Sequence, residues 1–296
     1  MKHDLGVLLR GALMGAADVV PGVSGGTMAL ITGIYPKLLS SIASFDLAAL
    51  RMLVRGDIAG AWNHVNGRFL IFLVLGIGFS ILSLAQGILW AMDAHPLPLW
   101  SFFWGLIAAS AWTLQRQLGQ LTWSKTMVLV LAAAIGASFV LIAPRELDPA
   151  LWMYFGAGFV AICAMILPGV SGSLLLLLMG MYQPVLLALK SFDLLVVAVF
   201  ATGAASGLMS FSRLLRYLLS RHHDLTLAAL TGFLWGSLTM VWPWRSEGDL
   251  PIPMFPSSFA DAYGDPLLGW CLLAGLVGLI LVVAIQARWG HGNKLA

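Results

Sequence analysis

The sequence predicts an all-α polytopic membrane protein made of two inverted-topology repeats, each a re-entrant broken-helix hairpin followed by three transmembrane helices. Three observations predict this fold: an apolar composition, six apolar runs of membrane-spanning length, and two apolar segments that break at matching positions. Of the 296 residues, 60% are hydrophobic and 10% are charged, and the mean hydropathy is +0.92. Soluble domains carry about 25% charged residues. The composition therefore excludes a soluble enzyme, a nucleic-acid-binding protein and a disordered chain.

Six apolar runs are predicted to cross the membrane. At about 1.5 Å per residue, each is long enough to span a hydrocarbon core of about 30 Å. The runs are residues 69–92, 97–115, 126–143, 194–220, 226–244 and 267–287. Residues 51–66 mix basic and apolar side chains, which predicts a helix lying on the membrane surface. The proline-rich connection 245–266 predicts an ordered loop or lid without regular structure.

Two further apolar segments, 5–43 and 150–190, are interrupted at their centres. The first break covers residues 21–27 (PGVSGGT) and the second covers residues 168–173 (PGVSGS). Proline removes a backbone donor and glycine lowers helix propensity, so neither segment is expected to form one continuous helix.

The two broken segments are copies of one unit. Aligned without gaps, residues 21–47 and 168–194 share 13 identities in 27 positions, among them Tyr35 with Tyr182. The similarity continues through the following spans. It predicts two repeats in one membrane domain, residues 1–147 and 148–296. The first holds the hairpin 5–43, the surface helix 51–66 and three spans, and the second holds the hairpin 150–190 and three spans.

The distribution of lysine and arginine favours hairpins over single crossings. With two re-entrant hairpins the chain crosses six times, and 13 of the 16 basic residues fall on the side that holds both termini. If each broken segment crossed once, the same residues would divide eight and eight. The positive-inside rule therefore predicts a multi-pass protein of the cytoplasmic membrane with both termini cytoplasmic. Three crossings per unit invert the second copy, as in secondary transporters whose broken helices meet near the midplane.

The broken segments are candidate anion sites. Backbone N–H groups at a helix start, with nearby hydroxyls, favour a phosphate or a carboxylate. The alternative is that glycine and serine only allow close helix packing. The candidate ligands begin the second arm of each hairpin: Ser24, Gly25, Gly26 and Thr27 in the first, and Ser171, Gly172 and Ser173 in the second.

Three charged residues are further candidates. Arg213 lies late in the run 194–220 and deeper than Arg216 and Arg221, which fit snorkelling anchors, so we expect Arg213 to meet an anionic head group. Arg10, in the first hairpin arm, is either an anchor or a ligand. Asp18 lies at membrane depth, where a carboxylate is costly. It is expected to carry a coupling proton, to act in gating, or to pair with Arg10.

The sequence gives no sign of catalytic chemistry. The six histidines show no metal-ligand spacing, and no Ser-His-Asp set or Walker-type loop is present. We expect no enzyme activity, no metal, no cofactor and no nucleic-acid partner. Coupling to a proton or sodium gradient is compatible with the sequence, and the oligomeric state is not predicted.

Several motifs resemble those of the DUF368 membrane proteins. They are residues 11–27 (GALMGAADVVPGVSGGT), 33–35 (GIY), 168–172 (PGVSG), 211–215 (FSRLL) and 232–244 (GFLWGSLTMVWPW). Members of that family are bacterial polyprenyl-phosphate transporters. The resemblance implies return of undecaprenyl phosphate from the outer to the inner leaflet, which recycles the carrier lipid of cell-wall synthesis. The two glycine–serine motifs would then hold the phosphate, and Arg213 and Arg10 would neutralise it.

Two other functions are weighed against this one. A secondary transporter of a small soluble anion would use the same anion sites but needs a closed aqueous path. An intramembrane lipid-phosphate hydrolase would need histidine and acid residues in an arrangement that the sequence does not offer.

Overall fold

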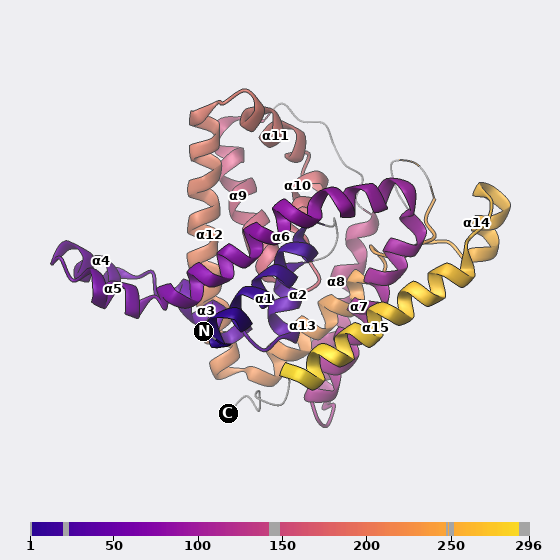
Figure 1. The fold of residues 1–296 in the computed structure, drawn as a ribbon, viewed down its shortest axis with the longest axis horizontal. Helices are drawn as coiled ribbons and strands as arrows, with labels where there is room; N and C mark the ends of the chain where they lie inside the picture. The colour runs from indigo at the N-terminus through magenta and orange to yellow at the C-terminus, as the bar shows by residue number, and fades with distance from the viewer. Residues whose placement is uncertain (1, 20–23, 142–148, 247, 249–251, 290–296) are drawn as a thin grey trace.

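The computed structural model of the chain describes residues 2–19, 24–141, 149–246, 248 and 252–289. Within these residues the protein is all-helical, with fifteen α-helices and one 3-10 helix (Figure 1). The only β-type pairing in this part of the chain is an isolated bridge between Arg245 and Pro253. The all-α prediction is confirmed.

Each broken segment forms three helices rather than the expected two arms. The first consists of α1 (Lys2–Asp18), α2 (Gly25–Ile31) and α3 (Tyr35–Ala43), and the second of α9 (Leu151–Ile166), α10 (Gly172–Leu178) and α11 (Tyr182–Lys190). The additional breaks fall at Gly33 and Gly180, whose φ angles of 73° and 68° end a helix at little cost for glycine. Residues 21–23 of the first predicted break lie outside the described residues.

Five of the six predicted spans coincide with helices that are long and apolar enough to cross a membrane. These helices are α6 (Gly67–Ala94), α7 (Pro96–Gln117), α8 (Trp123–Ser138, extended by the 3-10 helix Phe139–Leu141), α12 (Leu194–Arg221) and α15 (Leu268–Trp289). The pair α10 and α11, bent by 107°, is apolar enough to form a broken span or a re-entrant loop. The described part of the chain thus has five or six candidate membrane spans.

The predicted span 226–244 is not a full-length helix. The helix α13 covers His223–Ser237, which is 15 residues or about 22 Å. The chain then turns at residues 238–241, and Pro243, which follows the turn, cannot continue a helix. The indole N–H groups of Trp242 and Trp244 donate to the carbonyl oxygens of Met254 and Pro266, which holds this stretch against the following connection.

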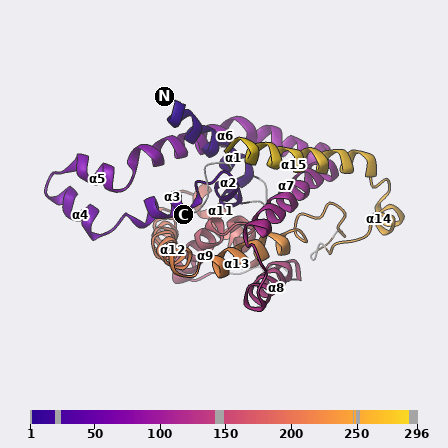
Figure 2. The same ribbon diagram turned by 90° about the horizontal axis from the view of Figure 1, so that it is seen from below.

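The surface helix predicted at 51–66 is two short helices, α4 (Leu47–Val54) and α5 (Ile58–His64). Gly56 separates them with a φ angle of 78°, and the Asp57 carboxylate caps α5 by accepting from the Gly60 N–H. The connection 245–266, expected to lack regular structure, contains α14 (Pro256–Tyr263). Figure 2 shows α4 and α5 at one edge of the molecule and α14 at the opposite edge.

The long helices pack in four pairs that match between the two halves. In the first pattern α1 packs on α6, and α9 packs on α12. In the second pattern, α7 packs on α15 and α13 packs on α8. Each of these two pairs therefore joins one helix from residues 1–147 to one helix from residues 148–296. The backbones approach closely, because a β-carbon at Gly11 would overlap the Leu73 carbonyl and one at Gly158 would overlap the Phe200 carbonyl.

The buried core lies where the first broken segment meets α7 and α13. Its fully buried side chains include Tyr35, Leu39, Ile107, Leu114, Leu230 and Leu234. Large apolar side chains on α6, α8, α12 and α15 are instead exposed on the outer surface, as expected for helices surrounded by lipid.

Candidate functional site

The two broken segments contact each other at their breaks. Ser24 is the N-cap of α2, and its hydroxyl accepts from the Gly26 N–H at 3.1 Å. The same hydroxyl donates to the carbonyl oxygen of Met165, in the last turn of α9, at 2.9 Å. A helix-capping side chain of the first segment therefore also holds the second segment.

Two more hydrogen bonds join the segments. The Gly169 N–H, in the second break, donates to the Thr27 hydroxyl at 3.0 Å. The Tyr35 hydroxyl donates to the Ile166 carbonyl at 3.0 Å. The side chains of Ser24, Thr27 and Tyr35 are buried, so these bonds are shielded from solvent. The sequence singled out Ser24 and Thr27 as anion ligands, and it did not predict that their hydroxyls bond to the second segment.

Asp18 takes a role that the sequence did not predict. Its carboxylate Oδ1 accepts from the Gly25 N–H at 2.7 Å. A negative charge therefore already lies at the start of α2, where the backbone N–H groups point. The carboxylate occupies the position that the sequence analysis assigned to a bound anion.

The second motif is bonded differently. The hydroxyls of Ser171 and Ser173 lie 3.0 Å apart and share one hydrogen bond. Ser171 is the N-cap residue of α10, and its side chain does not cap that helix. Gly172 lies against the Ala161 carbonyl, with which a β-carbon would overlap. The hydroxyls of this motif thus form fewer hydrogen bonds to the rest of the protein than those of Ser24 and Thr27.

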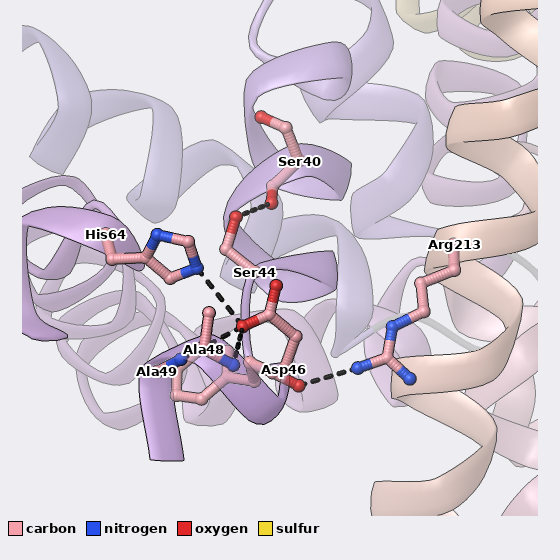
Figure 3. A network of polar contacts seen from close by, with 8 residues as sticks. Ser40, Ser44, Asp46, Ala48, Ala49, His64 and Arg213 are labelled. Carbon is pink, nitrogen blue, oxygen red and sulfur yellow. Dashed lines mark hydrogen bonds and ion pairs between the residues drawn. The ribbon is translucent and has the colours of Figure 1, made fainter. Parts of the chain in front are cut away.

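Arg213 is placed at the end of the first broken segment. From α12 its guanidinium donates to the Phe45 carbonyl at 2.7 Å (Figure 3). The neighbouring Asp46 carboxylate accepts from the N–H groups of Ala48 and Ala49 and contacts the His64 ring at 3.2 Å. The bond from Ala49 holds the pKa of the Asp46 carboxyl below its ordinary value. In this conformation Arg213 fastens the connection between α3 and α4 to α12.

Arg10 remains in the first arm, as expected, where it is half-buried on α1. The structure therefore brings together Ser24, Gly25, Gly26 and Thr27 with Asp18 and with the second break. The Arg213 guanidinium bonds instead to the Phe45 carbonyl.

Sequence reasoning missed a cavity of about 960 Å³ beside the first broken segment. Its walls come from α2 and α3 and from the ends of α7, α12, α13 and α15. The polar lining residues are Thr113, Gln117, Arg216, Ser220, His223 and Gln286. Arg216 was expected to be a membrane anchor. The basic character of residues 213–223 was the available signal, but only the packing of six helices shows which of these residues face a common space.

Comparison with known proteins gives consistent results. Residues 14–253 match the family model described as VCA0040-like, undecaprenyl phosphate translocase-like. The chain is 48% identical over 293 residues to the polyprenyl-phosphate transporter of Vibrio cholerae serotype O1, covering 94% of this chain and 95% of the relative. It is 30% identical over 254 residues to the polyprenyl-phosphate transporter of Staphylococcus aureus, covering 80% and 85%. No solved structure gives a significant match.

Proposed function

The chain belongs to the undecaprenyl phosphate translocase-like family, and from that premise we propose that it transports polyprenyl phosphate across the bacterial cytoplasmic membrane. The direction proposed is from the outer to the inner leaflet, where undecaprenyl phosphate serves again as the carrier lipid for cell-wall and surface-polymer synthesis. The observation that carries this proposal, beside the family, is the direct contact between the two broken segments at Ser24, Thr27 and Tyr35. Broken helices that meet inside a membrane protein are typical of a substrate path.

The two halves, residues 1–147 and 148–296, are proposed to be inverted repeats with both termini cytoplasmic. The basic residues support this orientation, since 13 of 16 fall on the side of the termini. The packing of the helices supports the relation between the two repeats. The pair α1 and α6 matches the pair α9 and α12, and the pair α7 and α15 matches the pair α13 and α8. Matching contacts between matching elements are expected when two copies of one unit face each other.

The phosphate is proposed to bind the two glycine–serine motifs in turn. In the described conformation Ser24 and Thr27 bond to the second segment, and the Asp18 carboxylate accepts the hydrogen bond of the Gly25 N–H. Separation of the segments would free these donors, and a phosphate would then replace the Asp18 carboxylate at the start of α2. Asp18 thereby acts in gating, because two negative charges cannot share one set of donors.

The second motif would serve the opposite leaflet. Ser171, Gly172 and Ser173 lie at the start of α10. Among the described residues, the hydroxyls of the two serines bond only to each other. Arg213 and Arg10 are proposed to neutralise the phosphate as it passes, which requires Arg213 to leave the Phe45 carbonyl. Guanidinium groups pair well with phosphate oxygens.

A flipping assay tests the transport proposal. Purified protein is placed in liposomes with polyprenyl phosphate in both leaflets, and an impermeant phosphatase digests the lipid exposed outside. We expect digestion to proceed from the outer leaflet alone to nearly all of the lipid. Digestion that stops at the outer leaflet, even with an imposed proton or sodium gradient, would contradict the proposal. Uptake of inorganic phosphate by the same liposomes would indicate a transporter of a small soluble anion.

The proposed ligands are tested with a matched control. The double variant S171A/S173A should slow digestion more than tenfold, because each hydrogen bond to a charged group is worth about 1.5–3 kcal/mol. The control is S191A, whose hydroxyl bonds only to carbonyls of its own helix and lies on an exposed residue. Equal digestion rates for the folded S171A/S173A and S191A variants would show that Ser171 and Ser173 do not bind the phosphate.

A further inference from the structure

The cavity beside the first broken segment has a polar end and an apolar wall. Arg216, Ser220 and His223 line it from the end of α12 and the start of α13. Gln117 and Gln286 line it from the ends of α7 and α15. A volume of about 960 Å³ lies within the range of about 300–1,000 Å³ that is typical of small-ligand sites. The space is therefore large enough for a head group and part of a chain.

The charge of the polar end is positive. Arg216 carries a permanent positive charge. Among the residues that the structure describes, no carboxylate lines the cavity and none forms an ion pair with Arg216. A guanidinium that faces a cavity without a counter-ion favours an anionic ligand, and its planar set of donors suits a phosphate.

His223 adds a second nitrogen to the same end. Its Nδ1 lies 3.4 Å from the Asp224 carboxylate, which is in turn held by the Lys125 ammonium group at 2.6 Å. Lys125 also donates to the Leu118 carbonyl at 3.0 Å, so the Asp224 carboxylate is fixed in place. The other ring nitrogen, Nε2, is buried and has no hydrogen-bond partner within the described part of the chain. A buried polar nitrogen without a partner is costly. The His223 side chain is 40% exposed, so the ring can turn toward the cavity, where an Nε2–H would donate to a ligand oxygen.

Apart from Thr113 and Tyr35, the rest of the wall is apolar. Leu30, Ile31 and Leu39 line it from the first broken segment, and Leu114 and Leu227 line it from the bundle. Val283 on α15 also lines the cavity and is 54% exposed, so the apolar wall continues to the outer surface of the protein. A chain attached to a bound head group can leave along this side into lipid.

Tyr35 connects the cavity to the contact between the two broken segments. It lines the cavity, and its hydroxyl bonds to the Ile166 carbonyl in the second segment. The first broken segment therefore separates the cavity from the second break. A head group in the cavity would lie on the side of the segment where the basic ends of α7, α12 and α15 gather.

We propose that this cavity binds the phosphate monoester of a lipid with an isoprenoid chain, with Arg216 and His223 on the phosphate and the chain along the leucine-lined wall. This site is separate from the two glycine–serine motifs and holds the lipid on the cytoplasmic side. The assignment rests on the proposed transport function for the identity of the lipid. Arg216, rather than Arg213, is the arginine of this site.

Binding to detergent-purified protein tests the assignment. The probes are farnesyl phosphate, farnesol and inorganic phosphate, each titrated while tryptophan fluorescence is recorded. We expect farnesyl phosphate to bind more tightly than either of the others, because only it has both the charge and the chain. Equal affinity for inorganic phosphate would overturn the lipid assignment in favour of a free anion. Equal affinity for farnesol would overturn the anion site.

Two variants separate Arg216 from the general positive charge of the region. R216Q should weaken binding of farnesyl phosphate at least tenfold, as expected when one charge-assisted hydrogen bond is lost. R221Q removes the same charge from the last residue of α12, which does not line the cavity, and should leave the affinity unchanged. Equal losses in the two variants would overturn the assignment.

A labelling measurement covers the case in which R216Q fails to fold. The variant S220C, with Cys163 and Cys271 replaced by alanine, places one thiol in the cavity wall. Farnesyl phosphate should slow its reaction with a water-soluble maleimide, and an unchanged rate at saturating lipid would overturn the site. The flipping assay on the unmodified protein separates the two proposals. If the protein flips lipid normally but farnesyl phosphate does not slow the labelling of S220C, only the cavity proposal is contradicted. If the protein does not flip lipid, the transport proposal is contradicted.

Discussion

The two broken segments have closely similar sequences but different bonding. In the first, Ser24, Thr27 and Tyr35 all bond to the second segment. In the second, the matching Ser171 bonds to Ser173, and the matching Tyr182 is 41% exposed. The motif itself sets where each helix begins and ends. The packing around it decides whether its hydroxyls bind the protein or remain for a ligand.

This difference is expected of inverted repeats that exchange conformations. When one repeat is engaged and the other is open, identical matched residues such as Ser24 and Ser171 must have unequal contacts. Thr27 differs, because its counterpart is Leu174, which has no hydroxyl. The described conformation then has the first segment docked on the second. Substitutions of residues that bond across the contact should therefore lower stability more than substitutions of their counterparts or of buried controls. The three comparisons below run from the largest expected effect to the smallest.

Replacing Thr27 by valine should have the largest effect. The change keeps the shape of the side chain but leaves the buried Gly169 N–H without its acceptor. An unsatisfied buried donor costs about 1–3 kcal/mol. We expect a lower midpoint of thermal unfolding in detergent and a weaker contact between the segments.

Thr231 provides the matched control. It is as buried as Thr27, but its hydroxyl donates only to the Leu227 carbonyl of its own helix. That carbonyl retains its helical hydrogen bond when the hydroxyl is removed, so T231V should change the midpoint little. Equal shifts for T27V and T231V would show that the bond between Thr27 and Gly169 does not stabilise the protein.

Much of the fold follows from local sequence, and the rest depends on packing between distant residues. Five of the six spans and the interruptions near 21–27 and 168–173 were predictable, because apolar length, proline and glycine act locally. The breaks at Gly33 and Gly180 were visible as matched glycines, but a glycine inside an apolar run does not by itself indicate a positive φ angle.

The candidate site was less predictable for the same reason. Hydroxyls that start a helix are chemically equal donors for an anion and for a carbonyl, and only the fold shows that Ser24 meets Met165. Arg213 and Arg216 are three residues apart on one helix, yet one bonds to Phe45 and the other lines the cavity. Depth estimated from sequence position could not separate them.

Alanine at Ser24 and at Ser171 gives the second comparison. The S24A variant loses an N-cap bond to Gly26 and a bond to Met165, and loss of an N-cap alone costs about 0.5–2 kcal/mol. The S171A variant loses only the bond to Ser173, and Ser171 does not cap its helix. The unfolding midpoint should therefore fall more for S24A than for S171A. The reverse order would contradict the bonding described here.

Phenylalanine at Tyr35 and at Tyr182 gives the smallest and sharpest comparison. Each change removes one hydroxyl and keeps the ring, so packing is preserved. The Tyr35 hydroxyl is buried and donates to Ile166, and a hydrogen bond of this kind contributes about 0.5–1.5 kcal/mol. Tyr182 is exposed, and Y182F should leave the unfolding midpoint unchanged. If the repeats exchange conformations, however, Y182F should still slow lipid flipping, because Tyr182 would then take the part that Tyr35 has here. A Y182F variant that flips lipid at the normal rate, beside a destabilised Y35F, would mean that the unequal bonding is a fixed property of the fold and not one state of an exchange.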